Sequence, residues 1–189
     1  FSSGKILELG LGITVTKLIS EYNITSDNFL ISKVINSALV LQSIILLVIT
    51  IPLYYFINYV FHYALPVIHH DLINDLTKIS LFIIVGSSFS SIFIGVLEGY
   101  KKMDLKLLVI TLPQLVFLIL LLLTNSNSGI IHVLNLYLIQ LLFFVIFSLL
   151  VAFIISKHNI FNSVFSFKEF KKMFLFGGTI QISGFLAIA

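Results

Sequence analysis

The chain lacks cysteine, and all eleven of its basic residues are lysine. Without cysteine it forms no disulfide, no thiolate metal site and no cysteine nucleophile. Charged residues are also scarce, at 10% of the 189 residues, whereas soluble domains usually carry about 25%. This shortage, together with a hydrophobic share of 59%, places the chain among polytopic membrane proteins.

Six apolar stretches predict an all-α, polytopic bundle of transmembrane helices. They cover residues 6–22, 34–60, 76–97, 105–124, 130–155 and 173–189. The last stretch has about 17 residues, fewer than the ~20 of a spanning helix, and the chain begins at Phe1 without Met or a signal-peptide pattern. We therefore expect a fragment with about five full spans and a truncated sixth, and further helices on both sides.

Lysines are concentrated in alternate segments between these stretches. Eight lie within 22–33, 98–106 and 157–172, whereas 58–78 and 125–129 contain only Lys78. By the positive-inside rule, the first group is predicted to be cytoplasmic. No loop is long enough for a soluble domain. We divide the chain into the transmembrane helices of an N-terminal transporter half, 1–165, and a cytoplasmic amphipathic linker with the start of the next helix, 166–189.

The linker begins with a helix-start pattern. Ser166 and Glu169 have the spacing of a capping box. Phenylalanines then fall on one helix face and lysines on the other, so the segment is expected to lie along an anionic membrane surface. Gly177 and Gly178, which follow, predict close packing or a flexible hinge.

Lys17 lies within the first apolar stretch, between two glycines and Glu21. A lysine near the centre of a membrane helix costs roughly 2.5–3.5 kcal/mol, so this helix belongs inside a bundle or beside a watery cavity. One interpretation makes Lys17 a cationic contact for an anionic substrate. The other has it snorkel to the cytoplasmic end and pair with Glu21. The sequence leaves both open.

Uncharged polar residues within the apolar stretches also have two interpretations. Asn36, Gln114, Gln140 and Gln181 could line a polar path or form hydrogen bonds between helices.

Other features predict how the helices pack and where they end. Ser87, Ser91 and Gly95 are spaced by four, a small-residue face suited to close helix contact. Pro52 is expected to bend or shorten the second span, and residues 23–32 are expected to form a loop.

Residues 61–75 are expected to form a second loop, which holds His62, His69, His70 and Asp71. This spacing matches no established zinc pattern, so we predict no metal site. The chain shows no Ser/His/Asp arrangement, phosphate-binding glycine loop or carboxylate pair in an aqueous cleft. We therefore expect no enzyme activity, no catalytic residue and no cofactor. The dispersed lysines also argue against nucleic acid as a partner.

Three segments together carry a family resemblance. LGLGITVTKLISEY precedes a polar loop and a long span, the third span closes with GVLEGYKKMDLKLL, and SFKEFKKMFLFGGTIQIS introduces the next helix. This arrangement resembles the polysaccharide biosynthesis/export proteins, the lipid-linked oligosaccharide flippases of the multidrug/oligosaccharidyl-lipid/polysaccharide exporter superfamily. The resemblance covers essentially the whole chain and maps it onto helices two to six and the start of helix seven. Such proteins have about twelve to fourteen helices in two halves around a central cavity.

The resemblance implies that an undecaprenyl-diphosphate-linked sugar unit, such as an O-antigen or other surface-polysaccharide repeat, is flipped across the cytoplasmic membrane of a bacterium. Its implied partners are this substrate, the lipid bilayer, a coupling ion and other polysaccharide-assembly membrane proteins. The candidates for the substrate path are Lys17, Asn36, Gln114 and Gln181.

Two alternatives stay open. A multidrug cation antiporter of the same superfamily would need an acidic residue deep in a helix. A polysaccharide-modifying or polymerising membrane enzyme would need a large outer loop with catalytic side chains.

Overall fold

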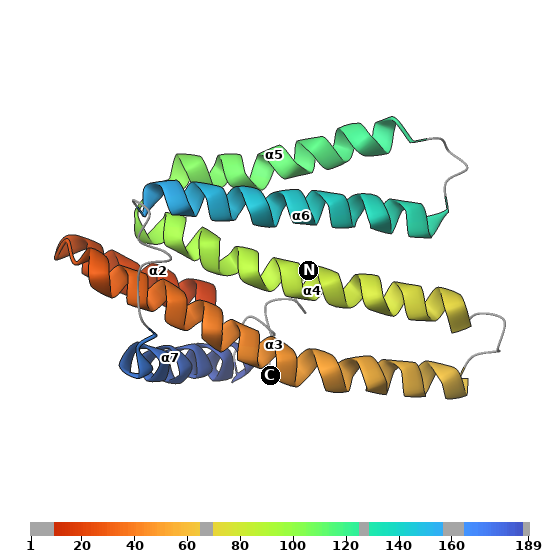
Figure 1. Ribbon diagram of the computed structural model, residues 1–189, viewed down its shortest axis with the longest axis horizontal. Helices are drawn as coiled ribbons and strands as arrows, with labels where there is room; N and C mark the ends of the chain where they lie inside the picture. The colour runs from red at the N-terminus through yellow and green to blue at the C-terminus, as the bar shows by residue number, and fades with distance from the viewer. Residues whose placement is uncertain (1–9, 65–69, 125–128, 157–164, 187–189) are drawn as a thin grey trace.

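The computed structural model describes residues 10–64, 70–124, 129–156 and 165–186, with the backbone alone at 61, 62, 64, 70–73, 130 and 180–186. The regular structure of these residues is entirely helical. The helices are α2 (Leu11–Ile24), α3 (Asn28–Ala64), α4 (His70–Gly99), α5 (Met103–Leu122), α6 (Ile130–Ile155) and α7 (Phe167–Leu186). In Figure 1, α3 to α6 run along the length of the molecule, and α2 and α7 lie at one end.

Four of these helices are long and apolar enough to cross a membrane: Asn28–Val60, Asn74–Gly99, Met103–Leu122 and Ile131–Ile155. They indicate a multi-pass membrane protein. The expected count of five full spans and a truncated sixth is not confirmed. α2 has 14 residues and measures about 21 Å, which is shorter than a hydrocarbon core of ~30 Å. α7 carries lysines and a glutamate in its first turns, and these lower its hydropathy.

The predicted loop at 23–32 is much shorter in the structure, because α3 begins at Asn28. Asp27 supplies the reason: its Oδ1 accepts a hydrogen bond of 3.0 Å from the Leu30 N–H. An aspartate at this position satisfies one of the free N–H groups in the first helical turn. Ser26, with φ at 56°, makes the reversal between the two helices.

The predicted loop at 61–75 is also too long. α3 continues past Pro52 to Ala64, and α4 begins at His70. The predicted shortening at Pro52 is therefore wrong. A proline removes one backbone hydrogen bond, and a long helix in a membrane protein keeps enough of the others to continue through it.

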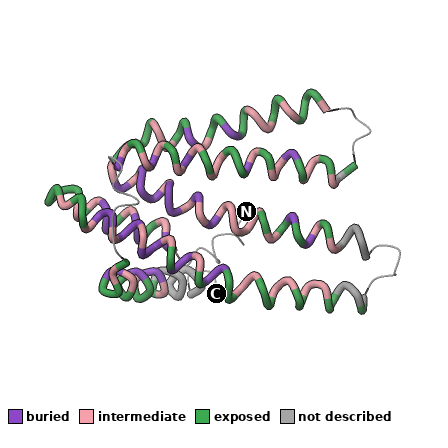
Figure 2. Tube along the Cα trace, in the orientation of Figure 1, coloured by how far each residue is buried: buried purple, intermediate pink, exposed green. Residues whose placement is uncertain are grey.

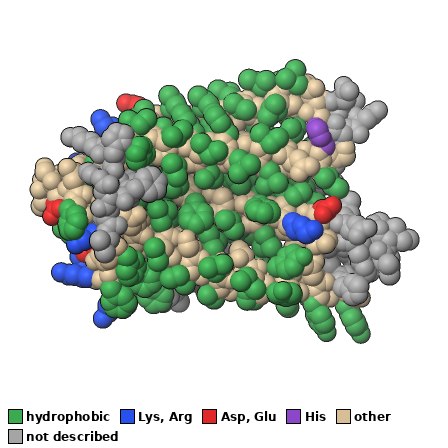
Figure 3. Space-filling model, viewed as in Figure 1, with side chains coloured by type: hydrophobic (Ala, Val, Ile, Leu, Met, Phe, Trp, Pro, Cys, Tyr) green, Lys and Arg blue, Asp and Glu red, His purple; other side chains and the backbone are tan. Residues whose placement is uncertain are grey.

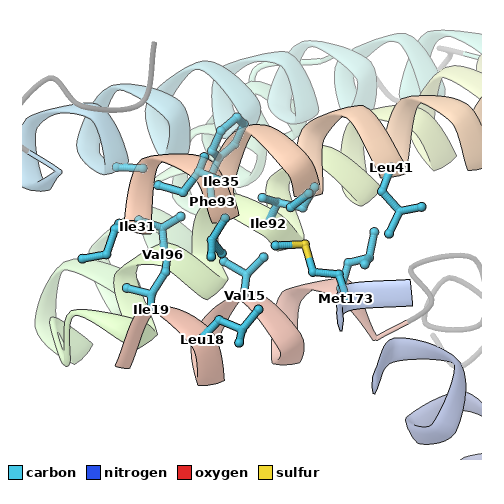
Figure 4. Packing of buried hydrophobic residues seen from close by; sticks show 14 of the residues in the cluster. Val15, Leu18, Ile19, Ile31, Ile35, Leu41, Ile92, Phe93, Val96 and Met173 are labelled. Atoms are coloured by element: carbon cyan, nitrogen blue, oxygen red, sulfur yellow. The ribbon is translucent and has the colours of Figure 1, made fainter. Parts of the chain in front are cut away.

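A buried core joins α2, α3, α4 and α7. Figure 4 shows Val15, Ile35, Val96 and Met173, one from each helix, pointing toward one another, and all four are fully buried. In Figure 2, the buried positions are concentrated around α2, the first half of α3 and the second half of α4. This end of the molecule is therefore the tightly packed one.

Small residues allow α2 and α4 to approach closely. A Cβ built on Gly95 would lie 2.5 Å from the Gly12 carbonyl oxygen, and one on Gly12 would lie 3.0 Å from the Ser91 carbonyl oxygen. The small-residue contact predicted from Ser91 and Gly95 is thus confirmed. Ser87 and Ser91 each donate their hydroxyl to a carbonyl of their own helix, those of Ile84 and Ser88.

The lysines are concentrated at the end where α2, α4 and α6 finish and α3, α5 and α7 begin (Figure 1). A broad hydrophobic surface separates this end from the opposite one in Figure 3. The predicted segregation of lysines is therefore present in the fold. We call this the lysine-rich end; that it faces the cytoplasm stays a prediction.

Candidate functional site between α2 and α7

A groove of about 570 Å³ lies between α2 and α7. Its walls combine charged, hydroxyl and apolar side chains: Thr14, Lys17, Leu18, Glu21, Lys172, Leu175, Phe176 and Thr179. On each helix these positions follow the spacing i, i+3, i+4 and i+7, which places them on a single face. α2 runs toward the lysine-rich end and α7 starts there (Figure 1), so the two faces are antiparallel.

Lys17 projects into this groove and is solvent-exposed. Its Nζ lies 4.1 Å from the centroid of the Phe176 ring, a cation–π contact worth about 0.5–1 kcal/mol at an exposed site. Among the described residues, no carboxylate lies within ion-pairing distance of Lys17. The predicted pairing with Glu21 is therefore not formed. The ammonium remains available to an anion, and that role stays a prediction.

Lys172, which lines the groove, belongs to a cluster of three hydrogen-bonded side chains from α2 and α7. Tyr22 Oη donates to Glu169 Oε2 over 3.1 Å. Lys172 Nζ donates to Glu169 Oε1 over 3.0 Å and to Tyr22 Oη over 2.9 Å. The Glu169 residue is only 3% exposed, so its charge depends on these donors. The hydrogen bonds with Tyr22 and Glu169 raise the pKa of Lys172 above its ordinary value.

The start of α7 confirms the predicted helix start but uses different hydrogen bonds. α7 begins at Phe167, immediately after Ser166. The Ser166 N–H donates to Ser37 Oγ of α3 over 3.4 Å, where a capping box would use the carboxylate of Glu169. Ser37 Oγ donates in turn to the Ser166 carbonyl over 3.3 Å. Glu169 is consequently available to bind α2, so α7 is attached to two other helices.

A second polar cluster joins α2, α4 and α5 near the lysine-rich end. Lys106 forms an ion pair with Glu98, and Thr16 Oγ1 donates to the second carboxylate oxygen of Glu98 over 2.9 Å. Thr16 Oγ1 also lies 3.2 Å from the Gly95 carbonyl oxygen. This cluster attaches α2 to α4 on the side away from α7.

The structure brings only Lys17, of the four predicted path residues, to the described groove walls. Asn36 is partly buried on α3. Gln114 is exposed on α5, which lies on the opposite side of the molecule from α7 in Figure 1. Gln181 belongs to α7, but its side chain lies outside the described set.

Sequence reasoning did not single out the other groove residues, such as Thr14, Phe176 and Thr179. Their three- and four-residue spacing is visible in the sequence, but the pairing of α2 with α7 is not. Tyr22 was missed for the same reason, since its partner Glu169 lies 147 residues away.

Gln42 was also missed, although it is the most unusual polar residue of the core. It is 0% exposed, and neither its Nε2 nor its Oε1 has a hydrogen-bond partner in the described structure. A buried amide without partners is costly. Nothing in its sequence context distinguishes it from the other amides.

Among the described residues, no group of three or more His, Cys, Asp or Glu side chains is arranged to hold a metal ion. The side chains of His62, His69, His70 and Asp71, the candidate group in the sequence, lie outside the described set.

Comparisons with protein-family models, curated proteins and solved structures found no match to this chain. The site is therefore interpreted from its own chemistry and from the sequence resemblance.

Proposed function

We propose that this chain is part of a transporter that flips a lipid-linked oligosaccharide across the cytoplasmic membrane of a bacterium by alternating access. The observation that carries the proposal is Lys17, whose exposed ammonium lines a groove with both polar and apolar walls. The four apolar helices and the resemblance to polysaccharide biosynthesis/export proteins support it.

The groove suits an amphiphilic anion. Lys17 offers an ammonium group without an ion-pair partner among the described residues, while Leu175 and Phe176 offer apolar surface. A hydrogen bond to a charged group contributes about 1.5–3 kcal/mol, so a diphosphate would gain from Lys17. A groove of about 570 Å³ is of the size that holds a small molecule. It would take the diphosphate and the adjoining sugar, while the lipid tail stays in the bilayer.

Deletion of the gene in its host tests this proposal. The expected result is loss of cell-surface polysaccharide and accumulation of lipid-linked units on the cytoplasmic side. A plasmid copy of the native gene should restore the surface polysaccharide. Normal surface polysaccharide in the deletion strain would overturn the proposal.

One observation favours a second candidate function, a multidrug cation antiporter. Glu21 also lines the groove and has no ion-pair partner among the described residues, so it could receive a cation. A panel of cationic drugs separates the two functions, because an antiporter mutant becomes drug-sensitive while its surface polysaccharide remains normal.

A further inference from the structure

α3 is too long to lie wholly within the hydrocarbon core of a bilayer. Its 37 residues measure about 55 Å at 1.5 Å per residue, against a hydrocarbon core of ~30 Å. Full immersion would need a tilt of about 57°, beyond the 0–40° range of membrane helices. If the charged Lys33 marks the boundary at the lysine-rich end, about 20 further residues bring α3 to the opposite boundary near Leu53. The last turns of α3 therefore extend past the hydrocarbon.

α4 gives an independent position for the same edge of the hydrocarbon core. Its Asp75 and Lys78 form an exposed ion pair with an N–O distance of 3.9 Å, and charged groups of this kind belong at the membrane surface. Tyr54 Oη of α3 donates to Asn74 Oδ1 of α4 over 3.3 Å. Tyr54 therefore lies at the same depth as Asn74, which is one helical turn farther from the membrane centre than Lys78. Both helices locate the edge of the hydrocarbon just before Tyr54.

Three tyrosines follow on one face of α3. Tyr55, Tyr59 and Tyr63 are spaced by four and are 68%, 73% and 89% exposed; we call them the tyrosine stripe. Exposed aliphatic residues of the same helix, among them Val48 and Ile51, precede them along the chain. Since no described helix covers these aliphatic side chains, the tyrosine stripe continues an apolar surface that is open to lipid.

We propose that the tyrosine stripe binds the phospholipid headgroup layer of the leaflet opposite the lysine-rich end. A tyrosine has an apolar ring and a polar hydroxyl, and such rings collect where hydrocarbon meets water. The headgroup layer is about 5–7 Å thick in each leaflet, and successive tyrosines of the stripe rise by about 6 Å. Tyr55 then lies at the hydrocarbon boundary and Tyr59 at the outer side of the headgroups, whereas Tyr63, about 12 Å from Tyr55, reaches the water beyond them. The stripe would fix the depth and tilt of α3.

The absence of tryptophan from the chain permits a direct test by fluorescence. Tyr55→Trp, Tyr59→Trp and Tyr63→Trp each introduce a single tryptophan, and Leu47→Trp, at an exposed position near mid-helix, is the control. Each full chain is reconstituted in vesicles of phosphatidylcholine and phosphatidylglycerol that carry bromine either at the shallow or at the deep end of the acyl chains. Iodide in the water reports aqueous exposure.

Tryptophan at 55 and 59 is expected to be quenched about twofold more by shallow than by deep bromines. Leu47→Trp is expected to show the reverse ratio, and Tyr63→Trp the strongest quenching by iodide. Two results would overturn the proposal. One is the absence of bromine quenching at both 55 and 59, which would place the stripe in water or against a protein, including a second copy. The other is stronger quenching by deep bromines at both positions. Helical content is checked by circular dichroism, and Phe56→Trp reports the same depth if Tyr55→Trp does not fold.

Discussion

Gly95 occupies the closest helix contact among the described glycines. A Cβ there would lie 2.5 Å from the backbone oxygen of Gly12, which has no flexible side chain to move aside. Gly95→Ala is therefore expected to separate α2 from α4 and to lower the free energy of unfolding by about 1–3 kcal/mol. Chemical unfolding of the purified chain in detergent micelles measures the loss.

Gly178→Ala is the matched control, because a Cβ at Gly178 would meet no described atom of a neighbouring element within 4 Å. Alanine favours a helix over glycine by about 1 kcal/mol, so this variant is expected to be as stable as the native chain or slightly more stable. Equal losses in the two variants would contradict a specific close contact at Gly95.

The buried amide of Gln42 leads to a second prediction. Neither of its polar atoms has a hydrogen-bond partner in the described structure, so burying them costs free energy that no hydrogen bond offsets. Gln42→Met removes both polar atoms and should raise the free energy of unfolding by about 1–3 kcal/mol. Gln114→Met, at an exposed position, is the control and should change the stability little. If Gln42→Met lowers the stability and Gln114→Met does not, the native Gln42 amide has hydrogen-bond partners that stabilise the fold, and the prediction is wrong.

These residues show what sequence patterns convey at this scale. The spacing of Ser91 and Gly95 predicted a close helix contact, because small residues on one face admit a neighbouring backbone. Gln42 gave no such signal, since its burial depends on which face of α3 the other helices cover. The groove position of Lys17 was one of two interpretations, and its contact with Phe176 depends on a helix far away in the sequence.

Among the helices, the attachment of α7 leads to a prediction about pH. The raised pKa of Lys172 means that the folded state binds its proton more tightly than the unfolded chain does, at an ordinary pKa of 10.5. The stabilisation is present below that pH and is lost as pH rises through the higher folded value. The protection of the α7 amides, which is the intrinsic exchange rate divided by the observed rate, should therefore be constant near neutral pH and should fall above about pH 10.5.

The same titration with Lys172→Met should show a smaller alkaline change. Lys171→Met, which alters an exposed neighbour, should behave like the native chain. If all three chains respond equally to alkaline pH, the cluster of Tyr22, Glu169 and Lys172 does not hold α7.

The sequence predicted which segments are helical better than it predicted where each helix begins and ends. Apolar runs located α3 to α6 because membrane spans require long uncharged segments. The boundaries near 23–32 and 61–75 were wrong because polar residues were taken as loop. In the structure, Asp27 caps α3, and α3 continues past Pro52.

Among the described lysines, all except Lys78 lie toward one end of the molecule (Figure 3), and this asymmetry predicts its orientation in the membrane. The absence of cysteine allows single-cysteine labelling with a maleimide that does not cross membranes. Lys78→Cys should react in intact cells, after removal of any outer barrier. Lys102→Cys should react only after the cytoplasmic membrane is opened. The opposite pattern would contradict the predicted orientation.

The helical bundle and its lysine-rich end were predictable because hydropathy and charge alternate along the chain. The pairing of α2 with α7 was not, since it depends on tertiary packing around residues such as Val15 and Met173. For the same reason, the sequence alone could not show that Lys17 lines the groove and Gln114 does not. The structure places Lys17 on the wall of a groove and Gln114 away from it.

The central claim is that Lys17 contacts the anionic part of a lipid-linked substrate, and complementation of a deletion strain tests it most directly. Cells carrying the native gene, Lys17→Gln, Lys17→Arg or the control Lys78→Gln are compared by the amount of surface polysaccharide relative to lipid-linked units inside. Loss of a charged hydrogen bond worth about 1.5–3 kcal/mol corresponds to a ~10- to 100-fold reduction in this ratio for Lys17→Gln. Cells with Lys17→Arg should keep much of the native ratio, and cells with Lys78→Gln should keep all of it. A native ratio in Lys17→Gln cells would contradict the claim.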